Sequence, residues 1–177
     1  EGFVFCCFNN AYKVSPTEFD IWMELLKQVE GSVLWLLDRP GSMADNLREQ
    51  MRRRGVDADR LVVAPRTTLE AHIARLQLAD LFLDTFNYNA HTTASDALWA
   101  GVPIVTKSGE GFAARVAASL LGAVGMEELV TTNARDYAQL ALDLARDPKT
   151  LSALRARLLA GRTTAPLFDT AQFTRHI

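Results

Sequence analysis

Residues 2–37, GFVFCCFNNAYKVSPTEFDIWMELLKQVEGSVLWLL, contain the pattern that decides the fold. The run Gly2–Phe8 is almost wholly apolar, as a strand buried on both faces requires. The segment Ser15–Glu18 then supplies an N-cap serine, a first-turn proline and a capping-box glutamate, which together predict a helix start. A second apolar run, Ser32–Leu37, follows the glycine that ends this helix. Strand, helix and strand in succession indicate two parallel strands joined by a helical crossover.

The same alternation continues along the chain. Further strands are predicted at Arg60–Ala64, Ala79–Asp84 and Val102–Thr106, and helices at Asp45–Arg54, Thr68–Gln77, Ser95–Ala100, Asp136–Arg146 and Pro148–Leu159. The tail from Gly161 to Ile177 is predicted to be a loop. We therefore predict a single α/β domain over residues 1–177, with a doubly wound parallel sheet and helices on both faces.

Composition excludes several classes of protein. The net charge of −2 gives no basic footprint for nucleic acid, and no apolar run approaches the roughly 20 residues of a membrane helix. No signal peptide is expected. The adjacent Cys6 and Cys7 point to opposite faces of a strand, so no disulfide framework and no metal site is expected, which favours the cytoplasm. Because Glu1 leads directly into an apolar run, we expect the chain to be a fragment of a longer protein.

In doubly wound sheets, ligands bind beyond the carboxyl ends of the strands, so the loops there are candidate sites. The loop Asn9–Lys13 contains neither a G-x-G-x-x-G turn nor a Walker A sequence. Its amides and its lysine could hold a phosphate, or the loop could be a solvated turn. In the next candidate loop, Pro65–His72, Thr67 or Thr68 caps a helix. His72 and Arg75, one helical turn apart, either meet a planar ligand or lie on the surface.

The loop after the fourth predicted strand, Asp84–Asp96, is the most informative. Thr92 and Thr93 open a helix whose N-terminal amides suit an anion, and His91 adds a donor. Asp96 could accept hydrogen bonds from a sugar diol, although a ligand-free capped helix would also explain the pattern. The segment Ser108–Arg115 is either a second anion site or a plain loop, and Trp22, Trp35 and Trp99 are expected in the core.

Several strings of residues occur in an order that resembles a known family. These strings are Phe5–Lys13 (FCCFNNAYK), Ser32–Leu37 (SVLWLL), Leu78–Thr85 (LADLFLDT), Asn89–Gly101 (NAHTTASDALWAG), Gly109–Glu110, Ala113–Ser119 (AARVAAS) and Pro166–Phe168 (PLF). The chain resembles the C-terminal catalytic half of the O-linked N-acetylglucosamine transferase family, and its bacterial members most of all. The resemblance covers nearly the whole chain.

The resemblance implies the C-terminal, Rossmann-like lobe of a GT-B glycosyltransferase, preceded in the whole protein by another lobe and by tetratricopeptide repeats. Such an enzyme transfers N-acetylglucosamine from UDP-GlcNAc to protein Ser or Thr, inverts the anomeric centre and needs no metal ion or other cofactor. The general base would lie in the other lobe. The isolated chain would then bind UDP weakly and transfer nothing.

The resemblance also assigns roles to residues. Asn10 and Lys13 would face the diphosphate, with Lys13 stabilising the leaving UDP. The other implied contacts are to the phosphates for His91, Thr92 and Thr93, to the ribose for Asp96, and to the uracil for Thr67, His72 and Arg75. Animal members have glutamine where Asn10 stands and lysine where Leu69 stands, which implies altered nucleotide affinity. The alternatives are a GT-B transferase for another UDP-sugar or acceptor, and a non-catalytic UDP-binding module.

Overall fold

The computed structural model describes residues 2–38 and 41–176. Within these ranges it contains one six-stranded sheet in the order β3-β2-β1-β4-β5-β6, and every neighbouring pair is parallel. The strands are β1 (Val4–Cys7), β2 (Val33–Leu37), β3 (Leu61–Ala64), β4 (Leu81–Leu83), β5 (Ile104–Lys107) and β6 (Val130–Thr131). This strand order is that of a doubly wound dinucleotide-binding fold, and it reverses at β1. The predicted fold class is confirmed.

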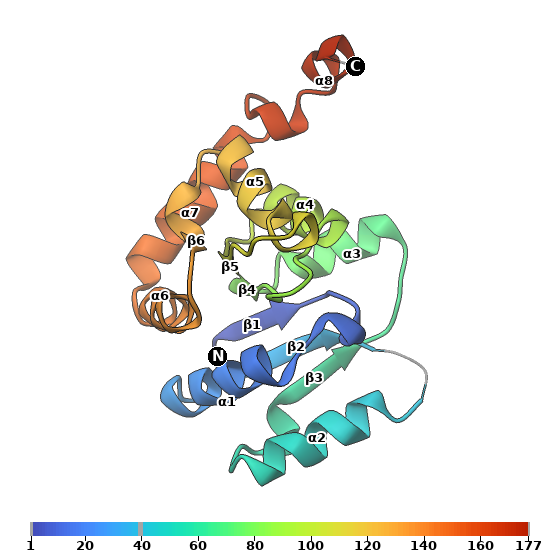
Figure 1. Ribbon diagram of the computed structural model, residues 1–177, viewed down its shortest axis with the longest axis vertical. Helices are drawn as coiled ribbons and strands as arrows, with labels where there is room; N and C mark the ends of the chain where they lie inside the picture. The colour runs from blue at the N-terminus through green and yellow to red at the C-terminus, as the bar shows by residue number, and fades with distance from the viewer. Residues whose placement is uncertain (1, 39–40, 177) are drawn as a thin grey trace.

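Helices cover both faces of the sheet (Figure 1). They are α1 (Pro16–Gln28), α2 (Met43–Arg53), α3 (Leu69–Leu76), α4 (Thr92–Ala100), α5 (Val116–Ala123), α6 (Ala134–Arg146), α7 (Pro148–Gly161) and α8 (Thr170–His176). Short 3₁₀ turns lie at η1 (Ala11–Lys13), η2 (Ala58–Arg60), η3 (Phe112–Ala114), η4 (Glu127–Leu129) and η5 (Pro166–Phe168). Helix α1 packs against α6, and α3 packs against α4. Helix α1 begins as predicted, with the Glu18 side chain accepting the Ser15 N–H at 2.9 Å.

The structure corrects three predictions. The tail is not a loop, because Leu167 and Phe168 of η5 pack against the core and α8 follows them. Figure 1 shows α8 projecting away from the sheet. Helix α4 begins at Thr92 rather than Ser95. Trp99 was predicted in the core but is 42% exposed. Its ring packs against the Phe168 ring, with centroids 5.0 Å apart, and not into the core.

A buried hydrogen-bonded chain ties the helices to the end of β4. The indole N–H of Trp22 in α1 donates to the Tyr137 hydroxyl at 3.2 Å, and this hydroxyl donates to the Asp84 carbonyl at 3.0 Å. The Phe86 ring packs edge-on against Tyr137, with centroids 4.9 Å apart. Because all of these groups are buried, the loop after β4 rests on a rigid base.

Cys6 and Cys7 are free and buried in β1. Burial raises the pKa of both thiols, and nearby carboxylates act in the same direction; the Cys7 thiol adds to the rise at Cys6, whereas the Asn9 N–H opposes the rise at Cys7. In the described ranges, no helix has the length and apolarity that crossing a bilayer requires.

Candidate functional site

Asn9 joins the two loops that meet where the strand order reverses. Its side-chain amide donates to Asp84 Oδ1 at 3.2 Å and to Thr85 Oγ1 at 2.8 Å. Its amide oxygen accepts from the Thr93 hydroxyl at 2.6 Å. One side chain at the end of β1 therefore fixes both the end of β4 and the first turn of α4. The sequence predicted a site residue at Asn10 but did not predict this role of Asn9.

Asp84 lies beneath the site, fully buried at the end of β4. Its carboxylate accepts from the backbone N–H groups of Thr85 and Ala90 at 2.8 and 2.7 Å, and from the Thr106 hydroxyl at 2.6 Å. Burial raises the pKa of Asp84 to about 7, and these hydrogen bonds oppose the rise. The carboxylate thus shapes the loop from below and is not available to a ligand.

Lys13 projects from η1 towards the loop after β4. Its Nζ donates to the Asn89 carbonyl at 2.9 Å and lies 3.7 Å from the centroid of the Tyr88 ring. Burial lowers the pKa of Lys13, while nearby groups including the Asp84 carboxylate favour its charged form. The structure therefore places a half-buried ammonium at the switch point, the position between β1 and β4 where the strand order reverses.

The loop that contacts this ammonium leads directly into the N-terminus of α4. Its N-cap residue, His91, makes no side-chain hydrogen bond to the first turn, and Thr92 is exposed. The His91 ring lies 4.8 Å from the Tyr88 ring and 6.1 Å from the Phe112 ring, between centroids. A helix start without a side-chain cap presents N–H groups to an anion, and the helix dipole favours that anion.

A cavity of about 320 Å³ opens next to the first turn of α4. Six of the ten predicted site residues line it: Thr67, Leu69, His72, Arg75, Thr93 and Asp96. Phe8, Leu37 and Arg66 also line it, and sequence analysis did not select them. Residues from four separate loops and helices thus converge on one cavity.

His72 and Arg75 form one unit on the wall of this cavity. Arg75 Nε donates to His72 Nδ1 at 3.0 Å, which leaves the ring proton of a neutral His72 on Nε2. That Nε2 lies 3.8 Å from Asp96 Oδ2, which is too long for a hydrogen bond. Burial lowers the pKa of His72, with a contribution from the Arg75 charge, and burial raises the pKa of Asp96. The cavity therefore offers a neutral imidazole, a guanidinium stacked on Phe8 at 4.7 Å, and a carboxylate with free acceptor positions.

Two other segments show how the remaining predictions stand. The Asn10 side chain donates to the Tyr12 hydroxyl at 3.3 Å. It lines neither the 320 Å³ cavity nor a second cavity, of about 670 Å³, between α1 and α2. Gly109 donates its N–H to the Ala114 carbonyl at 2.8 Å, and a Cβ at Gly109 would lie 2.8 Å from the Ala114 methyl group. Close packing thus accounts for this glycine, which favours the plain loop over a second anion site.

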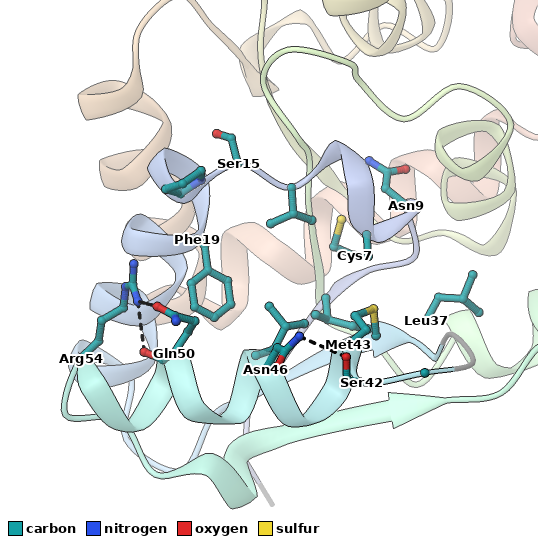
Figure 2. A pocket seen from close by; sticks show the side chains of 16 residues that line it. Cys7, Asn9, Ser15, Phe19, Leu37, Ser42, Met43, Asn46, Gln50 and Arg54 are labelled. Atoms are coloured by element: carbon teal, nitrogen blue, oxygen red, sulfur yellow. Dashed lines mark hydrogen bonds between the residues drawn. The ribbon is translucent and has the colours of Figure 1, made fainter.

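The larger cavity, of about 670 Å³, has Ala11 of η1 in its lining and is shown in Figure 2. Figure 2 shows it between α1 and α2, with Asn9 at one end and Arg54 at the other. None of the ten predicted site residues lines it. Arg54 is already paired with Asp20 at 2.6 Å. Across the part of the chain that the structure describes, no three His, Cys, Asp or Glu side chains are grouped as metal ligands.

Comparisons with known proteins agree with this architecture. The family model for glycosyl transferase family 41 matches residues 1–177. The chain is 40% identical over 173 residues to the UDP-N-acetylglucosamine–peptide N-acetylglucosaminyltransferase of Caenorhabditis elegans, covering 98% of this chain and 15% of that protein. It is 39% identical over 178 residues to the probable UDP-N-acetylglucosamine–peptide N-acetylglucosaminyltransferase SEC of Arabidopsis thaliana, covering all of this chain and 18% of that protein. It therefore spans less than a fifth of the length of these relatives.

Solved structures extend the likeness to three dimensions. A variant of the Thermobaculum terrenum O-GlcNAc transferase superposes with a TM-score of 0.89 and 32% identity, over 99% of this chain and 35% of that one. Anabaena HepE in complex with UDP and glucose superposes with a TM-score of 0.70 and 14% identity, over 99% of this chain and 47% of that chain. At this low identity, the likeness shows the fold alone. Sheet order, site position and these likenesses define the Rossmann-like lobe of a GT-B glycosyltransferase. The chain belongs to glycosyl transferase family 41.

Proposed function

We propose that this chain is the donor-nucleotide-binding half of an inverting transferase that moves N-acetylglucosamine from UDP-GlcNAc to Ser or Thr of proteins. The names of its relatives in Caenorhabditis elegans and Arabidopsis thaliana describe transfer of N-acetylglucosamine to peptide. One observation carries the proposal: at the switch point Lys13 contacts the loop that leads into α4, and the first turn of α4 lines the 320 Å³ cavity. A cation and free helix amides suit a diphosphate, and the adjoining cavity suits a nucleoside.

The nucleoside would occupy the cavity. Its walls carry the stacked Phe8 and Arg75 pair and the neutral His72, which suit the flat, polar edge of uracil. Thr67 also lines the cavity. Asp96 has acceptor positions that no described residue fills, and the ribose diol would donate to them. The charged diphosphate would then lie towards the mouth of the cavity, at Thr93.

The phosphates would bind at the first turn of α4. His91, Thr92 and Thr93 lie there, and the Thr93 hydroxyl already donates to Asn9 at 2.6 Å. A phosphate could accept from the backbone N–H groups while Thr93 keeps this bond, so the loop need not rearrange. The Asn10 side chain donates one N–H to the Tyr12 hydroxyl, and its second N–H would be the donor for a phosphate.

Lys13 would act on the leaving group. In the transfer step the acceptor hydroxyl attacks the anomeric carbon, the bond from that carbon to the β-phosphate oxygen breaks, and its electron pair remains on UDP. The new negative charge develops on that oxygen, where the ammonium of Lys13 stabilises the transition state more than the ground state. The general base that takes the acceptor proton would come from the other lobe, and no metal ion is required in this scheme.

The rest of the enzyme would lie outside this chain. We propose that the other lobe and tetratricopeptide repeats receive the acceptor protein, and that the protein works in the cytoplasm, where free thiols such as Cys6 and Cys7 persist. The isolated chain is then expected to bind UDP weakly and to transfer nothing. Leu69 is 61% exposed at the cavity rim and supplies no charge to the nucleotide.

Calorimetric titration of the 177-residue chain with UDP tests the binding step. CMP and NAD serve as control ligands, and Thr163→Val, at an exposed threonine outside the site, serves as the control variant. We expect selective binding of UDP that weakens at least tenfold in His91→Ala and in Thr93→Val. Equal binding of all three ligands, or unchanged affinity in both variants, would refute this placement of the nucleotide.

Turnover of the full-length protein tests the reaction. We expect N-acetylglucosamine transfer to a protein acceptor, and a loss of about 10²–10³ in kcat for Lys13→Ala, the range seen when one oxyanion-stabilising donor is removed. UDP binding without transfer of any sugar would instead identify a non-catalytic UDP-binding module. Transfer from a different UDP-sugar would retain the site and change the donor.

A further inference from the structure

We propose that Tyr88 is a positioning residue for Lys13, and that its ring face holds the Lys13 ammonium where the leaving diphosphate develops charge. This inference rests on the proposed function and adds to it a residue that the sequence motifs did not select. Tyr88 lies in the loop between β4 and α4, and Lys13 lies in η1, after β1. The two side chains meet only because β1 and β4 are neighbours in the sheet.

The geometry fixes the ammonium from two sides. Lys13 Nζ lies 3.7 Å from the centroid of the Tyr88 ring, well inside the range of a cation–π interaction. The same Nζ donates to the carbonyl of the next residue, Asn89, at 2.9 Å. An ammonium has three N–H donors, so at least one remains for a ligand after these two contacts.

The loop that makes both contacts is itself held in place. The Tyr88 carbonyl accepts from the Thr85 hydroxyl at 2.6 Å, and the Asn89 side chain donates to the Thr85 carbonyl at 2.7 Å. The Asn89 N–H donates to the Ala113 carbonyl at 2.8 Å. A rigid platform therefore sets the position of Lys13, whose four-carbon stem would otherwise sample many rotamers.

The ring face of Tyr88, and not its hydroxyl, makes the contact. The side chain is 39% exposed, and in the described part of the chain its hydroxyl has no hydrogen-bond partner. The other close ring is that of His91, 4.8 Å away between centroids. Tyr88 thus lies between the cation and the start of α4, the two groups assigned to the diphosphate. Preorganised charge stabilises a transition state without the cost of reorganisation, so positioning of Lys13 should affect kcat.

A double-mutant cycle in the full-length protein tests the inference with UDP-GlcNAc as the donor. Turnover is measured for Tyr88→Leu and Tyr88→Phe, each alone and combined with Lys13→Ala. We expect Tyr88→Leu to lower kcat about 3- to 30-fold, the range of a partly desolvated cation–π contact, with the donor KM within twofold. Tyr88→Phe keeps the ring face and should stay within twofold of wild type. In the Lys13→Ala background, Tyr88→Leu should have no further effect.

Trp99→Leu is the matched control. Trp99 is an exposed aromatic residue at the far end of α4, and Arg162 lies over its ring at 5.5 Å. Its loss removes a cation–π contact of the same kind away from the site, so kcat should stay unchanged. A fall in kcat as large as that of Tyr88→Leu would show that loosening α4 is sufficient, and would overturn the inference.

Three other outcomes would also overturn it. Equal losses in Tyr88→Phe and Tyr88→Leu would show that the hydroxyl acts. An equal loss with and without Lys13 would show that Tyr88 acts independently of that residue, and a rise in donor KM at constant kcat would indicate direct contact with the donor. If wild type transfers nothing, or Lys13→Ala turns over normally, the proposed function fails at that step.

A second measurement separates the positioning from the reaction. In NMR spectra of the 177-residue chain, the Lys13 Cε protons should be shifted upfield by the ring current in wild type and Tyr88→Phe, and should return to ordinary values in Tyr88→Leu. Ordinary values in wild type would refute the positioning whatever the activity.

Discussion

Removing the charge of Asp84 should change how stability depends on pH. Burial raises its pKa from 3.8 in the unfolded chain to about 7 in the folded protein, so between these values the folded state binds more protons. The free energy of unfolding should therefore fall as pH rises from about 4 to about 7, and level off above that. A pKa difference of about 3, at about 1.4 kcal/mol per pKa unit, corresponds to a loss of at most about 4 kcal/mol.

Asp84→Asn isolates this contribution. The amide keeps one oxygen for the Thr85 and Ala90 N–H groups, and its NH₂ can donate to the Thr106 hydroxyl, so most of the hydrogen bonds survive. Because the amide does not titrate, wild type should lose up to about 4 kcal/mol relative to the variant between pH 4 and pH 8. The other carboxyl groups titrate in both proteins and cancel in the difference.

Urea unfolding followed by tryptophan fluorescence, at pH values from 4 to 8, measures this difference. Asp59→Asn, at an exposed aspartate, controls for the loss of one negative charge. A difference between wild type and Asp84→Asn that stays constant within about 0.5 kcal/mol over this range would refute the reasoning. So would a difference that changes in the opposite direction, because the carboxylate would then be favoured in the fold.

Three further substitutions test separate parts of the structure. Leu69→Lys places a cation at the rim of the 320 Å³ cavity, so UDP binding measured by calorimetry should tighten about two- to fivefold, and by less at high salt. Unchanged affinity at low salt would place the nucleotide elsewhere. Tyr137→Phe leaves the buried Trp22 N–H without a partner and should cost about 1–3 kcal/mol in urea unfolding; a neutral result would mean that the indole finds another acceptor. Gly101→Ala forces a side chain into a backbone with φ of 84° and within 2.7 Å of Leu159, so the melting temperature should fall by several degrees, and no change would count against the packing described.

The fold could be predicted from sequence because its signals are local. Strands buried on both faces appear as short apolar runs, and the Ser15–Glu18 segment marks a helix start by itself. Elements with a short or weak sequence pattern were not predicted. Strand β6 is only two residues long, and the turn η5 and helix α8 follow a polar stretch. The predicted range of α4 began at Ser95, three residues late, although Thr92 and Thr93 were recognised as the residues that open this helix.

The candidate site could be predicted only in part, for a related reason. Six predicted residues meet in one cavity because each follows a strand whose carboxyl end faces the same edge. The roles of Asn9 and Tyr88 depend on the pairing of β1 with β4 in the sheet. The residues next to either position in the sequence give no information about which strands pair. Asp84 was missed because a carboxylate at a strand end is usually solvated, and only the assembled structure buries it.

The strand order has a consequence for the order of folding. Strands β1, β2 and β3 lie within the first 64 residues and pair with one another, so they can form early. The hydrogen bonds from Asn9 to Thr85 and from Lys13 to Asn89 each join residues 76 positions apart. Such distant contacts form late, because the chain entropy of closing the loop opposes them. During synthesis one edge of the central strand β1 therefore stays unpaired until β4 has been made, and the ligand site forms only once the chain has been extended through α4.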